Sequence, residues 1–99
     1  MYATIRTYAD APELADQLTA RSSEVEELIG SVPGFQGYFI VKTDGGCATI
    51  SLFDDASGAE ESTRRAKQWL ADNAGAISSP PMTVWQGDVL LQHGALARV

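Results

Sequence analysis

The chain has 99 residues, of which 44% are apolar and 20% charged, and its size and composition describe one globular domain over residues 1–99. Thirteen acidic residues against seven basic ones give a net charge of −6, the wrong sign for binding nucleic acid or an anionic membrane surface. One cysteine and one histidine are too few for an intrachain disulfide or a zinc site. No segment resembles a membrane span or a secretion signal. We therefore expect a cytoplasmic protein with no metal or other cofactor.

The first half of the chain predicts a strand, a helix and a hairpin. Residues 2–8 are rich in β-branched and aromatic types, which favours a strand. A helix is expected from Asp10, as its N-cap, to about Gly30, because apolar residues recur at helical spacing. Those residues are Leu14, Leu18, Val25, Leu28 and Ile29.

A turn over residues 32–34 then leads into two further strands. We expect these strands over residues 35–43 and 47–53, joined as a hairpin by the sequence Asp-Gly-Gly at 44–46.

The second half predicts one more helix and one more strand. Ser57 and Glu60 have the spacing of a capping box, and the apolar pattern that follows indicates a helix to about Gly75. The sequence Ser-Ser-Pro-Pro at 78–81 stops this helix. A long last strand is expected from Met82 to about His93, with a bulge or bend at positions 87–88.

The order strand, helix, strand, strand, helix, strand predicts the α+β ferredoxin-like fold, βαββαβ. Because crossover connections are right-handed, both helices cover one face of a four-stranded antiparallel sheet.

The other face of the sheet is expected to be apolar as well. The third strand directs Cys47, Thr49, Ser51 and Phe53 to one side, which we assign to the helices. We assign Tyr38, Ile40, Ile50 and Leu52 to the opposite face, and the side of Trp85 stays open between pocket wall and interface. So large an apolar face is unusual for a monomer. We therefore predict a homodimer through the sheet faces.

Four segments carry a resemblance to a known family: Tyr2–Arg6, Val32–Phe35, Ile50–Asp54, and Gly58–Ser62 with Trp69. With these segments the chain resembles the dimeric α/β-barrel superfamily, and within it the small antibiotic-biosynthesis-monooxygenase-like proteins. The resemblance implies that two subunits pair their sheets into a barrel. It also implies that each subunit keeps a small-molecule pocket between its own sheet and helices.

The chemistry of this family is varied and includes cofactor-free oxygenation of aromatic polyketides, haem degradation and isomerisation. In its oxygenases and haem degraders the pocket row of the third strand ends in a tryptophan, with an important asparagine nearby. Here that row ends in Phe53, and neither the first nor the third strand contains an asparagine. Haem degraders also carry an axial histidine on the second helix, which this chain lacks. The resemblance therefore argues against haem chemistry and weakens the case for oxygenation.

Six residues form the candidate pocket: Arg6, Thr49, Ser51, Phe53, Trp69 and Asn73. A charged residue in a central strand needs water, an acid or a ligand. For Arg6 an acidic partner is the favoured interpretation and ligand contact the alternative. Trp69 is either a core residue, the more frequent case on an apolar helix face, or a ring that stacks on a ligand. Thr49 and Ser51 either bond neighbouring backbone or orient a substrate.

The other reactive residues have simpler interpretations. His93 lies at the end of the last strand, where a solvated or interface histidine is favoured over a catalytic base. Cys47 has no neighbouring base and is expected to be inert. Arg64 and Arg65 follow Glu60 and Glu61 by four residues, the spacing of ion pairs on a solvated helix face.

Two functional hypotheses follow. In the first, the protein binds a small apolar or aromatic molecule between sheet and helices, with cofactor-free monooxygenase chemistry as an extension. In the second, it is a non-catalytic dimeric accessory or regulatory module whose core is filled. A cavity of a few hundred Å³ would favour the first hypothesis, and close packing the second.

Overall fold

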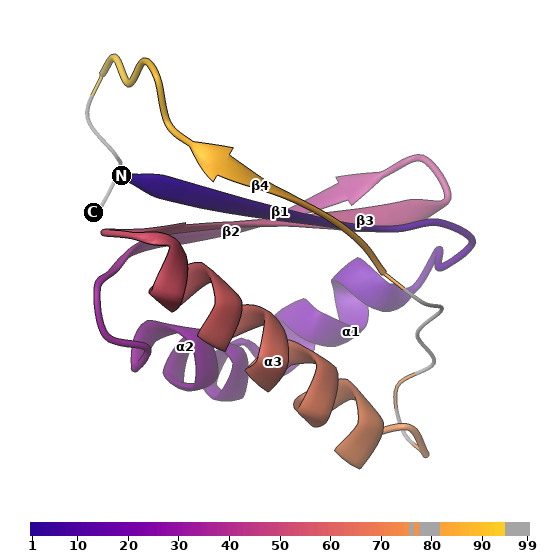
Figure 1. Cartoon of the computed structure of the whole chain (residues 1–99). Coiled ribbons are helices and arrows are strands. Elements are labelled where there is room, and N and C mark those ends of the chain that lie inside the picture. The colour runs from indigo at the N-terminus through magenta and orange to yellow at the C-terminus, as the bar shows by residue number, and fades with distance from the viewer. Residues whose placement is uncertain (76, 78–81, 95–99) are drawn as a thin grey trace.

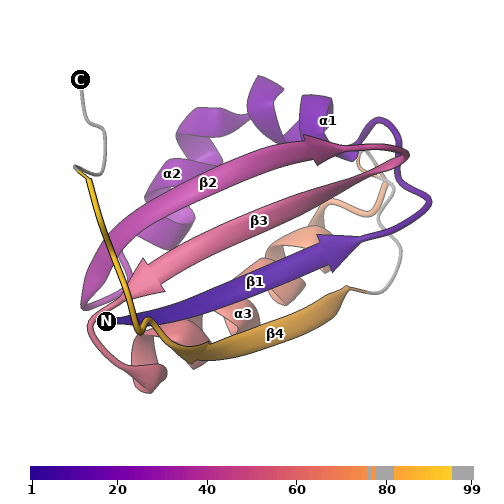
Figure 2. The ribbon, with the colours of Figure 1, turned by 90° about the horizontal axis from the view of Figure 1, so that it is seen from above.

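A computed structural model describes residues 1–75, 77 and 82–94, and in this part of the chain every helix lies on one face of a single sheet (Figure 1). The strands are β1 (Tyr2–Tyr8), β2 (Phe35–Thr43), β3 (Gly46–Phe53) and β4 (Thr83–Asp88), and the helices are α1 (Leu14–Ala20), α2 (Ser22–Gly30) and α3 (Ala56–Asp72). Figure 2 shows the antiparallel sheet in the order β2-β3-β1-β4. The predicted α+β ferredoxin-like fold is therefore confirmed.

The first predicted helix is two helices, which meet at Arg21. Asp10 has a positive φ of 55° and lies in the preceding turn, so the expectation that it caps the helix is wrong. Arg21 leaves the helical region at φ −115° and ψ 33°. One turn earlier the Thr19 hydroxyl donates to the carbonyl of Ala15 at 2.7 Å, a bond that tends to bend helices.

The start of α3 also differs from the expected capping box. The Asp55 side chain caps this helix by accepting hydrogen bonds from the amide and the hydroxyl of Ser57, at 3.1 and 2.6 Å. Ser57 lies one residue inside the helix, and the helix ends at Asp72, before the expected Gly75. The predicted stop at 78–81 lies outside the described residues.

Gly58 lets the first turn of α3 pack closely on β3. A Cβ atom at this position would lie 2.9 Å from Cδ1 of Phe53, closer than such contacts come. Phe53 is fully buried, so the helix and the strand could not keep this spacing with a larger residue at position 58.

The last strand is shorter than expected. It ends at Asp88, so positions 87–88 are its final residues and not a bend in its middle. The amide of Val89 donates once more to the carbonyl of Met1, at 2.9 Å. Beyond this bond the chain leaves the sheet on the side away from the helices (Figure 1), and Leu90 and Leu91 are almost fully exposed.

The register of β2 against β3 corrects the face assigned to two residues. Asp44 and Gly45 form the loop and Thr43 lies opposite Gly46, which places Tyr38 opposite Ser51 and Ile40 opposite Thr49. Directly opposed residues of an antiparallel pair share a face. Tyr38 and Ile40 therefore point toward the helices, and both pack against the buried core.

The open face of the sheet carries an apolar row that crosses all four strands. Cross-strand pairing aligns Phe39, Ile50, Ile5 and Trp85 in that order. Exposed fractions are 41% for Phe39, 37% for Ile5 and 61% for Trp85, and Val41 beside the row is 42% exposed. Trp85 thus lies on the open face, which no helix of the described chain covers (Figure 2).

The buried core lies between the sheet and the helices in two clusters. One surrounds the hairpin end of the sheet and contains Tyr8, Ala11, Leu14, Ala15, Leu18, Val25, Cys47 and Ile77. The other lies where α2 and α3 meet β3 and contains Ile29, Val32, Phe53 and Ala59. The helices of the described residues are too short or too polar to cross a membrane.

Candidate functional site

The central feature of the interior is the guanidinium of Arg6. Only 1% of this residue is exposed. Nη1 donates to Ser62 Oγ at 3.3 Å and to Thr63 Oγ1 at 2.9 Å, and Nη2 donates to Ser51 Oγ at 3.0 Å. Nε, also buried, has no acceptor. Ser62 in turn donates to the carbonyl of Ala59 at 2.8 Å, so its one hydroxyl proton is already used.

Arg6 has no acidic partner among the described residues, because none of the ion pairs found there includes it. The favoured interpretation of the sequence, pairing with a carboxylate, is therefore wrong. Within residues 1–75, 77 and 82–94, the partners that the charge finds are neutral hydroxyl groups. A buried charge held in this way is costly, since hydroxyl dipoles compensate it less well than an opposite charge.

A small cavity lies beside Arg6, between the sheet and the helices. Its volume is about 20 Å³, and its polar wall is formed by Arg6, Tyr8, Tyr38 and Thr49 from the sheet. The hydroxyl of Thr49 is buried and makes no hydrogen bond of acceptable geometry. A space of this size holds about one water molecule, so the interior is closely packed.

The two tyrosines of this wall are neutral at physiological pH. Burial raises the pKa of Tyr8 to about 12, and the positive charge of Arg6 opposes only part of this effect. Burial also raises the pKa of Tyr38, again against the charge of Arg6. Neither phenol therefore acts as a proton acceptor or as a counter-charge at neutral pH.

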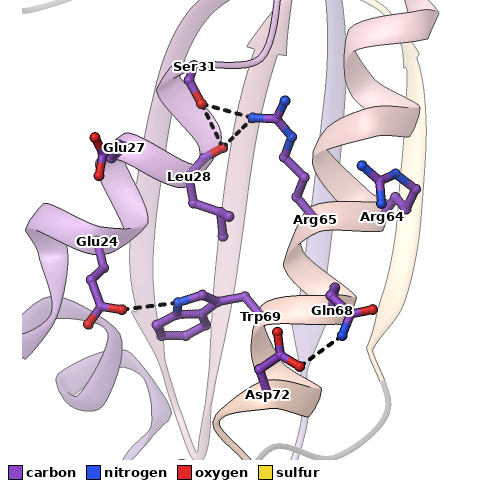
Figure 3. Close-up of a pocket in the computed structure, with 9 residues that line it drawn as sticks. All are labelled: Glu24, Glu27, Leu28, Ser31, Arg64, Arg65, Gln68, Trp69 and Asp72. Carbon is purple, nitrogen blue, oxygen red and sulfur yellow. Dashed lines mark hydrogen bonds between the residues drawn. The ribbon is translucent and has the colours of Figure 1, made fainter.

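Trp69 and Leu28 separate the cavity from an open groove between α2 and α3. The groove has a volume of about 500 Å³ and shares both residues with the cavity. Figure 3 shows the indole of Trp69 directed from α3 toward Glu24 on α2, to which its Nε1 donates at 3.4 Å. The guanidinium of Arg21 lies over the Trp69 ring, with its Cζ 4.9 Å from the ring centroid.

At the other end of the groove Arg65 links α3 to the end of α2. Its Nη1 donates to the carbonyl of Leu28 at 3.0 Å and to Ser31 Oγ at 2.9 Å (Figure 3). Arg64 and Arg65 both pair with Glu61, at 2.6 and 2.8 Å, and these bonds hold the pKa of Glu61 at about 2. The predicted pair of Arg65 with Glu61 therefore forms, whereas Arg64 pairs with Glu61 at i,i+3 and not with Glu60 as expected.

The structure brings together four of the six candidate pocket residues. Arg6, Thr49 and Trp69 line the cavity, and the Ser51 hydroxyl accepts a hydrogen bond from Nη2 of Arg6. Phe53 lies in the second core cluster, where it packs edge-on against Phe35 with ring centroids 6.1 Å apart. Asn73 lies at the end of α3 and does not line the cavity.

The Asn73 side chain instead positions its neighbours. Its amide donates to the carbonyl of Trp69 at 2.8 Å, and its oxygen accepts from Nη1 of Arg21 at 2.8 Å. These bonds hold Arg21 against the indole of Trp69.

Sequence reasoning missed the two α3 hydroxyls that bind Arg6, and it placed Tyr38 on the wrong face. Ser62 and Thr63 stand alone as hydroxyl residues in the middle of a charged helix. The side of a helix that faces a sheet usually carries aliphatic residues. Hydroxyl residues at such positions indicate a buried polar partner.

The remaining reactive residues lie away from this site. Cys47 is buried at the hairpin end, and burial raises the pKa of its thiol. His93 follows β4 and lies outside the cavity. The described residues contain no cluster of histidine, cysteine or acidic side chains that could hold a metal ion.

Neither a family model nor a curated protein matches the sequence, but solved structures match the fold. A protein of unknown function from Nitrosomonas europaea superposes with a TM-score of 0.71 at 17% identity, over 97% of this chain and 95% of the other. A putative antibiotic biosynthesis monooxygenase from the same organism gives a TM-score of 0.68 at 13% identity, over 94% and 93%. This chain has the antibiotic-biosynthesis-monooxygenase-like fold. A haem degrader from Mycobacterium tuberculosis, solved with two haems in its active site, shares the monooxygenase-like fold at a TM-score of 0.66 and 15% identity, over 95% and 100%.

The residues of this chain do not fit haem. α3 contains no histidine. Tyr8 and Tyr38 beside Arg6 would bind iron only as phenolates, and burial raises the pKa of both.

Proposed function

We propose that this chain is a homodimeric protein that binds a small apolar or aromatic molecule between its sheet and its helices. The observation that carries the proposal is the meeting of aromatic rings with unsatisfied polar atoms at one buried point. Tyr8, Tyr38 and Trp69 line a cavity together with Arg6 and Thr49. Arg6 and Thr49 each have a buried polar atom without a hydrogen-bond partner. Buried polar atoms in native proteins nearly always have a partner, and a bound molecule would supply one here.

The homodimer rests on the open face of the sheet. The row formed by Phe39, Ile50, Ile5 and Trp85 is apolar across all four strands, with three of its members more than a third exposed. The segment that carries Leu90 and Leu91 leaves the sheet on this same side (Figure 1). An apolar face of this extent typically marks a protein interface, and a second copy packed sheet to sheet would cover it.

Binding requires the interior to open, and α2 is the element best suited to move. It has nine residues and is separated from α1 by the break at Arg21. Few polar bonds join it to α3, chiefly those of Arg65 to the carbonyl of Leu28 and of Trp69 to Glu24. Movement of α2 would withdraw Leu28 and join the groove of about 500 Å³ to the cavity at Arg6.

Binding is supported better than catalysis, because the cavity wall lacks a base. No carboxylate or imidazole lines it, and the two phenols stay protonated at neutral pH. Cofactor-free oxygenation needs an acceptor for the substrate proton and a group that stabilises the resulting anion. Arg6 can stabilise the anion, but the cavity wall offers no proton acceptor. A monooxygenase activity would therefore be confined to substrates that are themselves acidic. Oxygen uptake with anthrone that is lost in Arg6→Met and kept in His93→Ala would establish that activity.

One observation favours the second candidate, a non-catalytic dimeric module. The cavity beside Arg6 has a volume of only about 20 Å³, which is the close packing expected of a filled core. In this case Trp69 contributes only to stability.

Calorimetric titration with 1-naphthol separates the two candidates. The wild type is compared with Trp69→Leu, changed at the cavity, and with Trp85→Leu, a matched change on the open face. The proposal predicts binding that is weakened at least about tenfold in Trp69→Leu, the loss of a large aromatic contact, and retained in Trp85→Leu. No binding by the folded wild type would favour the filled module. Equal binding by both variants would place the ligand away from Trp69 and contradict the proposed site.

A further inference from the structure

We propose that the molecule bound in the interior is an acid, with its carboxylate held by Arg6 and its apolar or aromatic part held by Leu28 and Trp69. The inference rests on the proposed function, since it specifies the ligand of the same site. It starts from a charge that the described part of the chain leaves unbalanced.

The described groups that face Arg6 leave its charge unbalanced. A guanidinium stays ionised in proteins, and Arg6 is buried among hydroxyls with no ion pair. Tyr8 and Tyr38, the titratable groups that share its cavity, are neutral because burial raises the pKa of each. A carboxylate brought into the cavity would therefore meet a positive charge that nothing else there neutralises.

Two buried polar atoms of the residues that line the cavity lack hydrogen-bond partners. Nε of Arg6 and Oγ1 of Thr49 are both buried, and neither has a partner. Arg6 and Thr49 are directly opposed across β1 and β3, a position that brings side chains within about 5 Å of one another. Both residues line the cavity. One carboxylate has two oxygens that can accept from two such donors.

The three hydroxyls already bound to Arg6 fix the direction of the free donor. Ser62 and Thr63 hold Nη1 from α3, and Ser51 holds Nη2 from β3. The guanidinium is planar and rigid, so these three bonds fix its orientation while Nε is left without an acceptor. This arrangement is typical of a preorganised receptor for an anion.

The apolar part of the ligand has a place on the groove side of the cavity. Leu28 and Trp69 form the boundary between cavity and groove, and Figure 3 shows both side chains between α2 and α3. A ring inserted between them would stack on the indole while its acid group reaches Arg6. The groove cations compete poorly for that acid, because Arg64 and Arg65 are already paired with Glu61.

Paired ligands of equal shape test the inference. Titration calorimetry compares 2-naphthoate with the uncharged 2-naphthamide on the wild type, on Arg6→Met and on Arg64→Met. We expect the wild type to bind the acid at least about tenfold more tightly than the amide, the usual advantage of a buried charge-assisted hydrogen bond. Arg6→Met should abolish this preference, and Arg64→Met, changed in the groove, should keep it.

A second variant covers the case in which Arg6→Met does not fold. Arg6→Lys keeps the positive charge but loses the rigid fork, so it should retain part of the preference for the acid. Equal binding of acid and amide by the wild type would overturn the inference while leaving the proposed function intact. If Arg6→Met still prefers the acid over the amide, or if Arg64→Met loses this preference, the acid lies in the groove and the inference is also overturned. Binding of neither probe would contradict the proposed function itself.

Discussion

Replacement of Ile5 by aspartate should dissociate the proposed dimer. Ile5 lies on the central strand β1 between Ile50 and Trp85, in the middle of the apolar row, and is 37% exposed. That fraction corresponds to about 65 Å² of surface, or about 1.6 kcal/mol of apolar burial per subunit when a partner covers it. Because both subunits carry the substitution, the dimer loses about 3 kcal/mol of apolar burial. Burying two unpaired carboxylates in the interface adds a further cost.

The dissociation constant of the dimer should therefore rise at least about a hundredfold. Sedimentation equilibrium measures it: the wild type should run at twice the chain mass of 10.6 kDa and Ile5→Asp at the chain mass. Circular dichroism should confirm a folded variant, because the exposed part of Ile5 lets the carboxylate reach water in the monomer. Ala71→Asp, a new charge on an exposed position of α3, should stay dimeric. A monomeric wild type, or an Ile5→Asp variant that remains dimeric, would refute the reasoning.

Three further predictions concern the fold. Gly58→Ala should lower the free energy of unfolding by about 1–3 kcal/mol in urea titrations, since the added methyl would press on Phe53; an unchanged midpoint would contradict the close approach. The raised pKa of Tyr8, about 12, means that above pH 10 the unfolded chain loses this proton while the folded chain keeps it. Unfolding free energy should therefore fall by about 2–3 kcal/mol between pH 10 and 12, and Tyr8→Phe should fall less over the same range; equal slopes would show that Tyr8 is not the group responsible. The buried thiol of Cys47, with its pKa raised by burial, should react with a disulfide reagent only at the rate of unfolding, and rapid reaction in the native state would contradict its burial.

The order of the strands could be predicted from the sequence, but the faces of β2 could not be read from alternation alone. Alternation gives two possible assignments, and a slip of one residue exchanges them. If Asp44, Gly45 and Gly46 are all counted as loop residues, Tyr38 and Ile40 are assigned to the wrong face of the sheet. In the structure only Asp44 and Gly45 form the loop, so Tyr38 faces Ser51. Two-residue loops are the commonest in hairpins, and that preference would have given the correct register.

The break in the first helix is invisible to hydrophobic periodicity. Leu18 and Val25 stand seven residues apart, two helical turns, so the apolar stripe reads continuously through Arg21. The break arises from local backbone and side-chain bonds, among them that of Thr19 to Ala15. Local bonds of this kind leave no mark in the spacing of apolar residues.

The candidate site was predicted in part, because residue types identify a buried charge but not its partner. Arg6 was expected to meet an acid, the usual solution for a buried cation. Its partners are hydroxyls from segments 45 to 57 residues away in sequence. Such partners follow from how α3 packs on the sheet, which neither spacing nor composition determines.

The two tryptophans allow the most direct test of the central claim, that a small molecule binds between sheet and helices. Trp69 lies at the cavity and Trp85 on the open face, so each indole N–H reports on one side of the sheet. In ¹H–¹⁵N spectra recorded during titration with 2-naphthoate, the account predicts a large shift of the Trp69 indole signal and of the α2 amides, with the Trp85 indole signal unchanged. A shift confined to Trp85, or no shift at saturating ligand, would contradict it.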